Sequence, residues 1–158
     1  HVNGYAASAA YWIASAADEM VVTPSGEVGS IGVVGVHDDI SAALEKLGVK
    51  KTVQSAGKFK TEGSQFGPLS EEALAHRQAQ IDAYYDKFVR AVARNRNVSL
   101  TAVKDGFGQG RMVMADAAVA EGMADKIATL DETIDRFASP QAPRKKFATQ
   151  REKRALSL

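Results

Sequence analysis

Cysteine is absent from the 158-residue sequence. Its absence excludes a disulfide framework, a thiolate zinc site and a cysteine nucleophile. Long apolar runs are also lacking, because each is interrupted within about a dozen residues, whereas a membrane-spanning helix needs about 20. Neither charge dominates, since 20 Lys and Arg residues stand against 19 Asp and Glu residues. This balance argues against a dedicated nucleic-acid-binding domain, which needs a basic face.

The chain opens with the residues HVNG and shows neither an initiator methionine nor a secretory signal peptide. We therefore expect a fragment or a processed chain. Hydrophobic residues make up 45% of the sequence and charged residues 25%, which suits one globular domain.

Positive charge is concentrated at the C-terminal end. Residues 139–158 contain six basic residues and one acid, and they begin with the linker-like sequence SPQAP. This shift predicts a folded domain over residues 1–138 and a basic, flexible tail over 139–158. The alternative for the tail is contact with nucleic acid or another acidic partner.

Segments typical of strands and helices alternate before the tail. We predict helices over residues 6–17, 40–47, 70–96, 100–104, 116–121 and 127–137, from apolar spacing, Ser70 as an N-cap and stops at Gly48 and Gly122. Short strands are predicted over 20–23, 30–34, 51–54 and 112–113, with a long polar loop over 55–68. The alternation predicts an α/β domain. So few short strands do not complete a sheet of the usual size, and we expect an upstream segment or a partner subunit to supply the rest.

Several chemical motifs are missing. The sequence has no GxGxxG and no Walker loop, and residues 106–110 (GFGQG) are interpreted as a turn. The histidines His1, His37 and His76 are far apart and lack metal-site spacing. Asp38 and Asp39 beside His37 are interpreted as a solvated loop.

Serine remains as a candidate nucleophile. Ser8 has small neighbours and precedes an apolar helix, so its hydroxyl would lie at the positive end of that helix, where backbone N–H groups can receive an oxyanion. From the residues alone, a helix cap or a small packing residue is the favoured interpretation.

A serine nucleophile needs a base, and His37 or a lysine would have to serve. Lys60 lies in the long polar loop. A lysine accepts a proton only when it is neutral, which is rare in water because its reference pKa is about 10.4. Read alone, Lys60 is interpreted as an ordinary surface lysine, since nothing in the sequence indicates its burial.

Several separated motifs change this assessment, because together they resemble the S49 peptidases. This family includes signal peptide peptidase A, also called protease IV, and the phage capsid-maturation proteases. Residues 7–19 (ASAAYWIASAADE) are similar to the nucleophile stretch, and residues 23–33 contain TP followed by GSIGV. Residues 55–63 (SAGKFKTEG) are similar to the lysine loop of the single-domain members, with Lys60 standing 52 positions after Ser8. Residues 110–125 (GRMVMADAAVAEGMAD) are similar to the family's last motif.

The resemblance implies a ClpP/crotonase-like fold of repeated ββα units, here without its N-terminal part. It also implies a Ser-Lys dyad with Ser8 as nucleophile, Lys60 as base, Ser30 orienting the lysine and the Ala9 N–H in the oxyanion hole. No metal or cofactor is implied. The expected substrates are extended peptides with small or apolar side chains, either signal-peptide remnants or phage scaffold and capsid proteins.

Partners follow from the same resemblance. We expect a homo-oligomer whose active sites draw on neighbouring copies, no nucleic acid, and membrane association only through a segment upstream of His1. The motifs do not separate a bacterial membrane-associated enzyme from a phage- or prophage-encoded one.

Two other hypotheses stay open. One keeps the fold but uses His37 in a Ser-His-Asp arrangement like that of the Clp proteolytic subunit. The other is a crotonase-like assembly module without activity.

Overall fold

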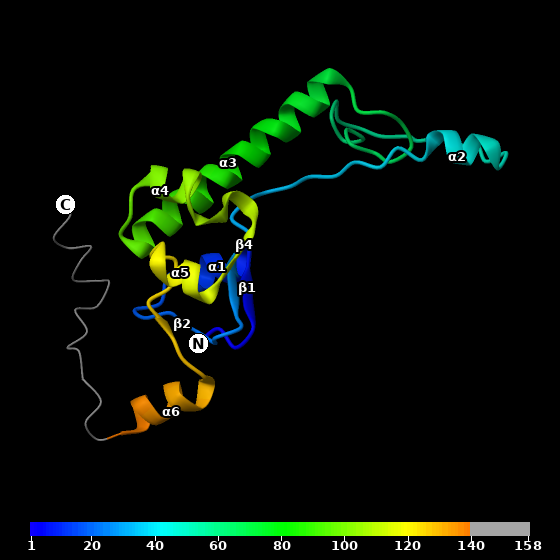
Figure 1. Cartoon of the computed structure of the whole chain (residues 1–158). Coiled ribbons are helices and arrows are strands. Elements are labelled where there is room, and N and C mark those ends of the chain that lie inside the picture. The colour runs from blue at the N-terminus through cyan, green and yellow to red at the C-terminus, as the bar shows by residue number, and fades with distance from the viewer. Residues whose placement is uncertain (140–158) are drawn as a thin grey trace.

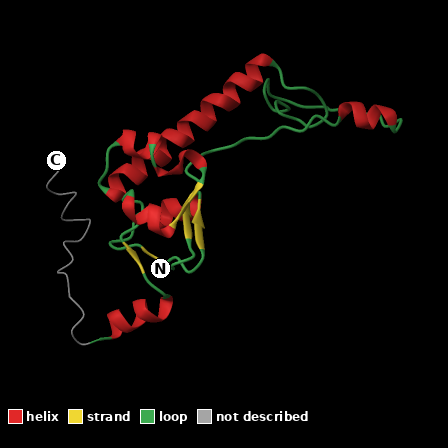
Figure 2. Ribbon diagram, viewed as in Figure 1, coloured by secondary structure: helices red, strands yellow, loops and turns green. Residues whose placement is uncertain are grey.

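The computed structural model describes residues 1–139, and it has two parts: a body that contains all the strands, and a long arm (Figure 1). The body combines helices with two small sheets, which appear as two separate groups of strands (Figure 2). The predicted α/β class is thus confirmed at the level of a mixed α/β structure with small sheets.

The larger sheet has three strands in the order β1-β3-β4. They are β1 (Tyr5–Ala7), β3 (Glu27–Gly29) and β4 (Met112–Met114). The strands β1 and β3 are parallel, with Ala7 opposite Gly29. The strands β3 and β4 are antiparallel, with Gly29 opposite Met112. One end of the sheet therefore gathers the residues that follow β1 and β3 and the residue that precedes β4.

A second, two-stranded parallel sheet pairs β2 (Val21–Val22) with β5 (Lys126–Ile127). Val2 forms a parallel bridge with Val22 on the other side. The predicted strand over 20–23 is confirmed in β2. The strand at 126–127 was not predicted, because it occupies the start of the segment assigned to the last helix.

The longest element is α3 (Glu71–Arg96), which agrees with the predicted helix over 70–96. Its cap forms as expected: the Ser70 hydroxyl accepts a hydrogen bond from the Ala73 N–H at 3.1 Å. Glu71 and Glu72 occupy the first turn, where carboxylates suit the helix dipole. The helix ends at Asn97, whose φ is 55°.

The other predicted helices are present with shifted bounds. They are α1 (Ala9–Ala14), α2 (Ser41–Lys46), α4 (Leu100–Asp105), α5 (Ala115–Ala120) and α6 (Leu130–Ala138). Residues 107–110, interpreted as a turn, form the short 3-10 helix η1 (Phe107–Gly110). The first helix starts three residues later than predicted because residues 5–7 pair with β3 instead.

Two strand predictions were wrong. The segment 30–34 is not a strand; the strand ends at Gly29, where a φ of 126° and then 52° at Ser30 turns the backbone out of the sheet. Residues 51–54 have no regular structure, since they lie in the arm, where no neighbouring strand offers hydrogen-bond partners.

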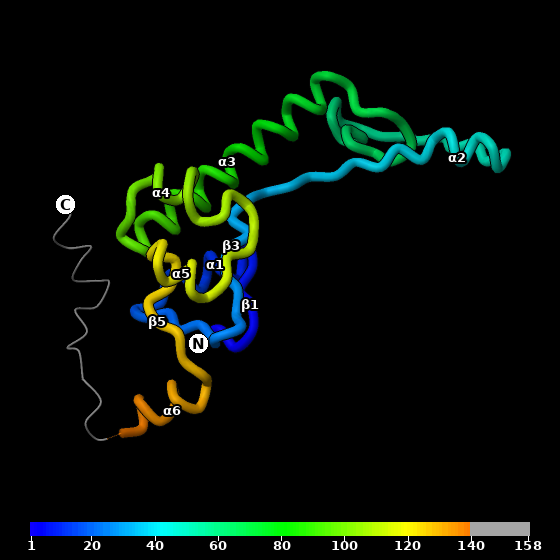
Figure 3. Tube along the Cα trace, viewed as in Figure 1, coloured from blue at the N-terminus to red at the C-terminus, as the bar shows by residue number. Residues whose placement is uncertain are grey.

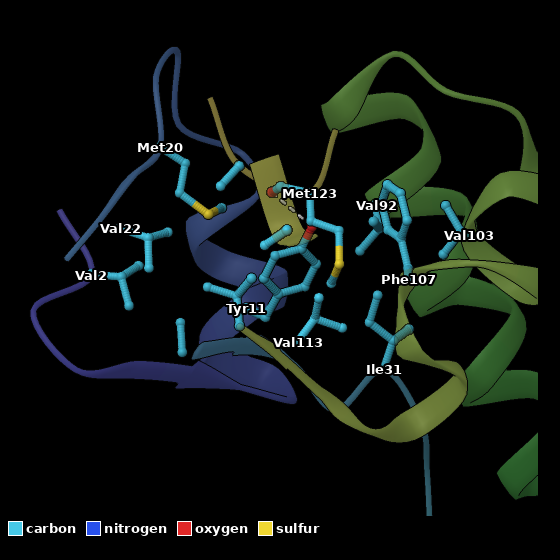
Figure 4. Close-up of a cluster of buried hydrophobic side chains, with 14 of the residues drawn as sticks. Val2, Tyr11, Met20, Val22, Ile31, Val92, Val103, Phe107, Val113 and Met123 are labelled. Atoms are coloured by element: carbon cyan, nitrogen blue, oxygen red, sulfur yellow. Dashed lines mark hydrogen bonds between the residues drawn. The ribbon is translucent and has the colours of Figure 1, made fainter. Parts of the chain in front are cut away.

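The hydrophobic core lies between the sheets and the C-terminal half of α3 (Figure 4). Tyr11 of α1 is fully buried in it and donates a hydrogen bond from its hydroxyl to the Met123 carbonyl at 3.0 Å. Trp12 stacks on Phe88 of α3 with ring centroids 4.6 Å apart. These contacts join the helix that follows Ser8 to the longest helix of the chain.

An ion pair joins Arg96 at the end of α3 to Asp125, which directly precedes β5. The Arg96 guanidinium donates two hydrogen bonds to the Asp125 carboxylate, at 2.7 and 2.9 Å, and only 7% of the Arg96 side chain is exposed. The same carboxylate accepts the Met20 N–H at 2.7 Å. Asp125 therefore holds the end of α3 and the start of β2 together.

The arm comprises residues 33–70 and runs out from the body to α2 at its far end, then back to the start of α3 (Figures 1 and 3). It carries many exposed apolar side chains, namely Val33, Val34, Val36, Leu47, Val49, Val53, Phe59 and Phe66. In residues 1–139, no helix combines the length and apolar character needed to cross a membrane. The tail predicted for 139–158 lies, from residue 140 on, outside the described residues.

Candidate active site

Ser8 occupies the turn between β1 and α1. Its backbone has φ 53° and ψ −120°, a conformation that residues other than glycine rarely adopt. The Ser8 N–H donates to the Gly29 carbonyl at 2.8 Å, and the Ser8 carbonyl accepts the Trp12 N–H at 3.0 Å. These two bonds hold the residue in its strained geometry.

The Ser8 side chain does not cap the helix. It stands at the N-cap position of α1, but its hydroxyl makes no capping hydrogen bond. A capping serine normally has an extended backbone, as Ser70 has at the start of α3. The geometry instead resembles the strained strand-to-helix turn on which hydrolases expose a nucleophile.

Ser30 lies beside Ser8 at the same end of the sheet. Each serine follows directly on a member of the register pair Ala7 and Gly29, and adjacent strands are about 4.8 Å apart. The Ser30 N–H donates to the Arg111 carbonyl at 2.9 Å. The structure thus brings together two of the serines that the sequence singled out.

Gly29 makes this close packing possible. Its φ is 126°, and a Cβ there would lie 2.8 Å from the Arg111 carbonyl oxygen. Any other residue would push the Arg111 segment away from Ser30. The contact is to a backbone atom, so no side-chain pattern in the sequence marks Arg111 as part of the site.

A strained segment supports the site from the side of β4. The four residues of η1 all have positive φ, between 43° and 92°. The Phe107 N–H at its start donates to the Glu121 carboxylate at 3.0 Å. Glu121 belongs to the last of the sequence motifs. Because its carboxylate accepts a backbone N–H, we assign it a structural role at the start of η1.

Ala9 is the first residue of α1 and is exposed. The first N–H groups of a helix have no partner within the helix. The Ala9 N–H is one of these groups, and it directly follows Ser8 in the chain.

Lys60 is not near Ser8 within one chain. It is exposed and lies in a run of turns between α2 and α3, where its N–H donates to the Gly57 carbonyl at 3.2 Å. That segment belongs to the arm, well away from β1 and α1 (Figure 1). One copy of the chain therefore presents the serines and the lysine at separate places.

His37 also lies in the arm, with its Nε2 3.0 Å from the Gly67 carbonyl oxygen. It is thus as remote from Ser8 as the Lys60 segment is. Within residues 1–139, no three His, Asp or Glu side chains group closely enough to hold a metal ion.

Known proteins resemble this chain over most of its length. The model of peptidase family S49 matches residues 1–142. A putative signal peptide peptidase SppA of Enterococcus faecium is 35% identical over 130 residues, which is 82% of this chain and 38% of that protein. Protease 4 of Haemophilus influenzae is 29% identical over 85% of this chain and 22% of its own length. The capsid assembly protease C of Escherichia phage lambda is 30% identical over 84% of this chain and 30% of its own length.

The chain spans less than half the length of each of these relatives. The match nevertheless includes β1, α1, β3 and the arm, and so every residue of the candidate site. The resemblance read from the separated sequence motifs is confirmed: the chain belongs to peptidase family S49.

Proposed function

We propose that this chain is the Ser-Lys catalytic portion of a serine endopeptidase. The observation that carries the proposal is the strained Ser8 at a strand-to-helix turn, with an uncapped hydroxyl and with Ser30 beside it, in a chain of family S49. Strain of this kind costs about 1–3 kcal/mol and is retained chiefly at functional sites.

The chemistry uses four groups. The Ser8 Oγ attacks the peptide carbonyl carbon while neutral Lys60 takes the hydroxyl proton. The Ala9 N–H stabilises the oxyanion, and Ser30 orients the lysine amine. The lysine returns its proton to the departing amine, which leaves Ser8 acylated. Water then attacks the ester, with Lys60 again as base, and frees Ser8. Since only neutral lysine accepts a proton, hydrolysis rises with pH.

Residues 1–138 would form the C-terminal portion of a ClpP/crotonase-like domain. The strand β1 is an edge of its sheet, and the side chain of Tyr5 on it is 79% exposed. Open edges are normally covered in finished folds. Further ββα units of the complete protein would cover this edge and add a second oxyanion donor.

Assembly would bring the two halves of the dyad together. The Lys60 segment projects on the arm, so Lys60 of one copy would meet Ser8 of a neighbour in a cyclic homo-oligomer. The exposed apolar side chains of the arm support this, because such surfaces are usually buried against a partner. The helix α3, which follows the arm directly, would lie close to the subunit contact.

The substrates would be extended peptides with small or apolar side chains. Relatives named as a signal peptide peptidase and as a capsid assembly protease match the chain at similar identity. Signal-peptide remnants and phage scaffold or capsid proteins are therefore the two substrate classes to assay. The proposal includes no metal or cofactor.

The test is hydrolysis of such peptides by the complete protein with Lys60→Ala, and with Lys58→Ala as a matched control. Lys58 stands two residues away on the same arm, where it is exposed, pairs with Glu72 at 3.4 Å and lies over the Phe59 ring at 4.5 Å from its centroid. We expect Lys60→Ala to be inactive and Lys58→Ala to be near normal. Normal turnover by Lys60→Ala would contradict the dyad, and His37→Ala would then be assayed in its place.

Mixing two inactive variants tests the placement of the dyad. A Ser8→Ala protein and a Lys60→Ala protein each lack one half, but a mixed oligomer contains intact pairs if they form between copies. Recovered hydrolysis on mixing would support this arrangement. Recovery is not expected if each pair forms within one copy. A fluorophosphonate probe that fails to label Ser8 of the unmodified protein would favour the inactive assembly module.

A further inference from the structure

Arg77 of α3 lies where the outgoing and returning limbs of the arm meet. Its Nη2 donates to the Val36 carbonyl of the outgoing limb at 2.9 Å. Its Nη1 lies against Gly63 of the returning limb, 2.9 Å from where a Cβ of that residue would be. One guanidinium thus contacts both limbs.

Other contacts join the limbs at the same level. The Ile40 N–H donates to the Gln65 carbonyl at 2.9 Å, and the His37 ring contacts the Gly67 carbonyl. These bonds fix the limbs to each other but not to the body. Arg77 adds a link to α3, beside the exposed Lys58–Glu72 pair, and α3 is anchored in the core through Phe88.

The glycine that ends the Lys60 segment is explained by this contact. Gly63 has a φ of 78°, and a side chain there would meet the Arg77 guanidinium. Gly63 is only three residues from Lys60, and a turn bond from the Glu62 N–H to the Phe59 carbonyl spans Lys60. A displacement of Gly63 would therefore also displace the backbone of Lys60.

We propose that Arg77 is a positioning residue for Lys60. By holding Gly63 and Val36 against α3, it fixes the direction in which the arm presents the lysine amine. This inference rests on the proposed Ser-Lys function and adds a residue to it. Arginine suits the task because its planar guanidinium carries several donors in a fixed geometry, whereas lysine offers a single charged nitrogen.

The experiment compares Arg77→Gln and Arg77→Lys with Arg90→Gln in the complete protein. Arg90 is a matched control on the same helix, where it forms an exposed pair with Asp86. Misplacing a catalytic group by about 1 Å costs roughly 100-fold in rate. We expect Arg77→Gln to lower kcat about 10- to 100-fold with little change in KM, and to slow fluorophosphonate labelling of Ser8 in parallel. Arg77→Lys should recover only part of the rate.

The unfolding midpoint and the oligomeric state of each variant are measured alongside. A loss of rate that comes with a loss of assembly or a lower midpoint would make Arg77 merely structural and overturn the inference. Full activity of Arg77→Lys would overturn the inference that the guanidinium must reach both Val36 and Gly63. Normal activity of Arg77→Gln together with an inactive Lys60→Ala would overturn the inference and leave the Ser-Lys function standing. Normal activity of Lys60→Ala would instead remove the function itself.

Discussion

Ser8 and Ser30 have nearly the same positive φ at one end of the sheet. Their φ angles are 53° and 52°, and each follows a member of the same register pair in parallel strands. Neither is a glycine, so both conformations are strained. The chain therefore places two strained hydroxyl-bearing residues side by side.

The strain at Ser8 predicts that the fold is more stable when the strain is removed, although the nucleophile is then lost. Ser8→Ala keeps a Cβ in the left-handed region, whereas Ser8→Gly removes that penalty at a smaller entropic cost. We expect the free energy of unfolding of Ser8→Gly to be about 1 kcal/mol higher than that of Ser8→Ala. Neither variant should hydrolyse peptides. Chemical denaturation of both variants measures the difference. An alanine variant as stable as the glycine variant would show that the backbone relaxes.

Ser30→Ala tests the second hydroxyl. If Ser30 orients the lysine amine without transferring a proton, its loss should slow acylation about 10- to 1000-fold, or about 1.4–4 kcal/mol of barrier. Ser25→Ala, in the exposed turn before the other end of β3, is the control and should acylate normally. The rate of fluorophosphonate labelling measures the step. An unchanged rate would leave Ser30 with a structural role only.

Asp125 is expected to matter for stability. Its replacement by alanine would leave the Arg96 guanidinium buried without its carboxylate and the Met20 N–H without its acceptor. We expect Asp125→Ala to lower the free energy of unfolding by about 3 kcal/mol. Asp86→Ala, which removes the exposed pair with Arg90, should stay within about 0.5 kcal/mol. Equal effects of the two substitutions in denaturant titrations would contradict the role of Asp125 in holding α3 and β2 together.

The Glu19–Arg136 pair predicts a pH dependence of stability. The Arg136 guanidinium donates two hydrogen bonds to the Glu19 carboxylate and holds the pKa of that carboxyl below its usual range. A lowered folded-state pKa adds stability above the unfolded value of about 4.3, and this is lost as pH falls through the folded pKa. Glu19→Gln should therefore be less stable than the unmodified chain at pH 7.

The difference between Glu19→Gln and the unmodified chain should shrink as the solution becomes strongly acidic. Thermal unfolding of both proteins across this range measures it. A difference that stays constant with pH would mean that packing of the glutamine, and not loss of the charge, is responsible.

The sequence predicted elements well where local chemistry decides them. The helix α3 could be placed because Ser70 caps it and its apolar face repeats over many turns. The strand β3 was misplaced because Ile31, Val33 and Val34 carry strong strand preferences, whereas the sheet ends where Gly29 turns the chain. Strand identity there depends on a partner that local patterns do not contain.

The site was predicted in part for the same reason. Family motifs indicated Ser8, Ser30 and Lys60, and the structure puts Ser8 and Ser30 side by side. No pattern could show that the Lys60 segment stands apart on an arm, because that depends on how residues far apart in the sequence pair with each other, such as Ile40 with Gln65 and Val36 with Arg77. The supporting roles of Arg111 and Gly29 run through backbone atoms, which leave no side-chain signal.

The stack between Trp12 and Phe88 has a practical consequence. Trp12 is the sole tryptophan of the sequence and lies four residues after Ser8. It packs on α3, the helix that directly follows the arm. Its fluorescence emission therefore reports a single contact, the one that joins the nucleophile turn to α3. A change in that emission on mixing subunits would test the proposed contact of the arm directly, without any added label.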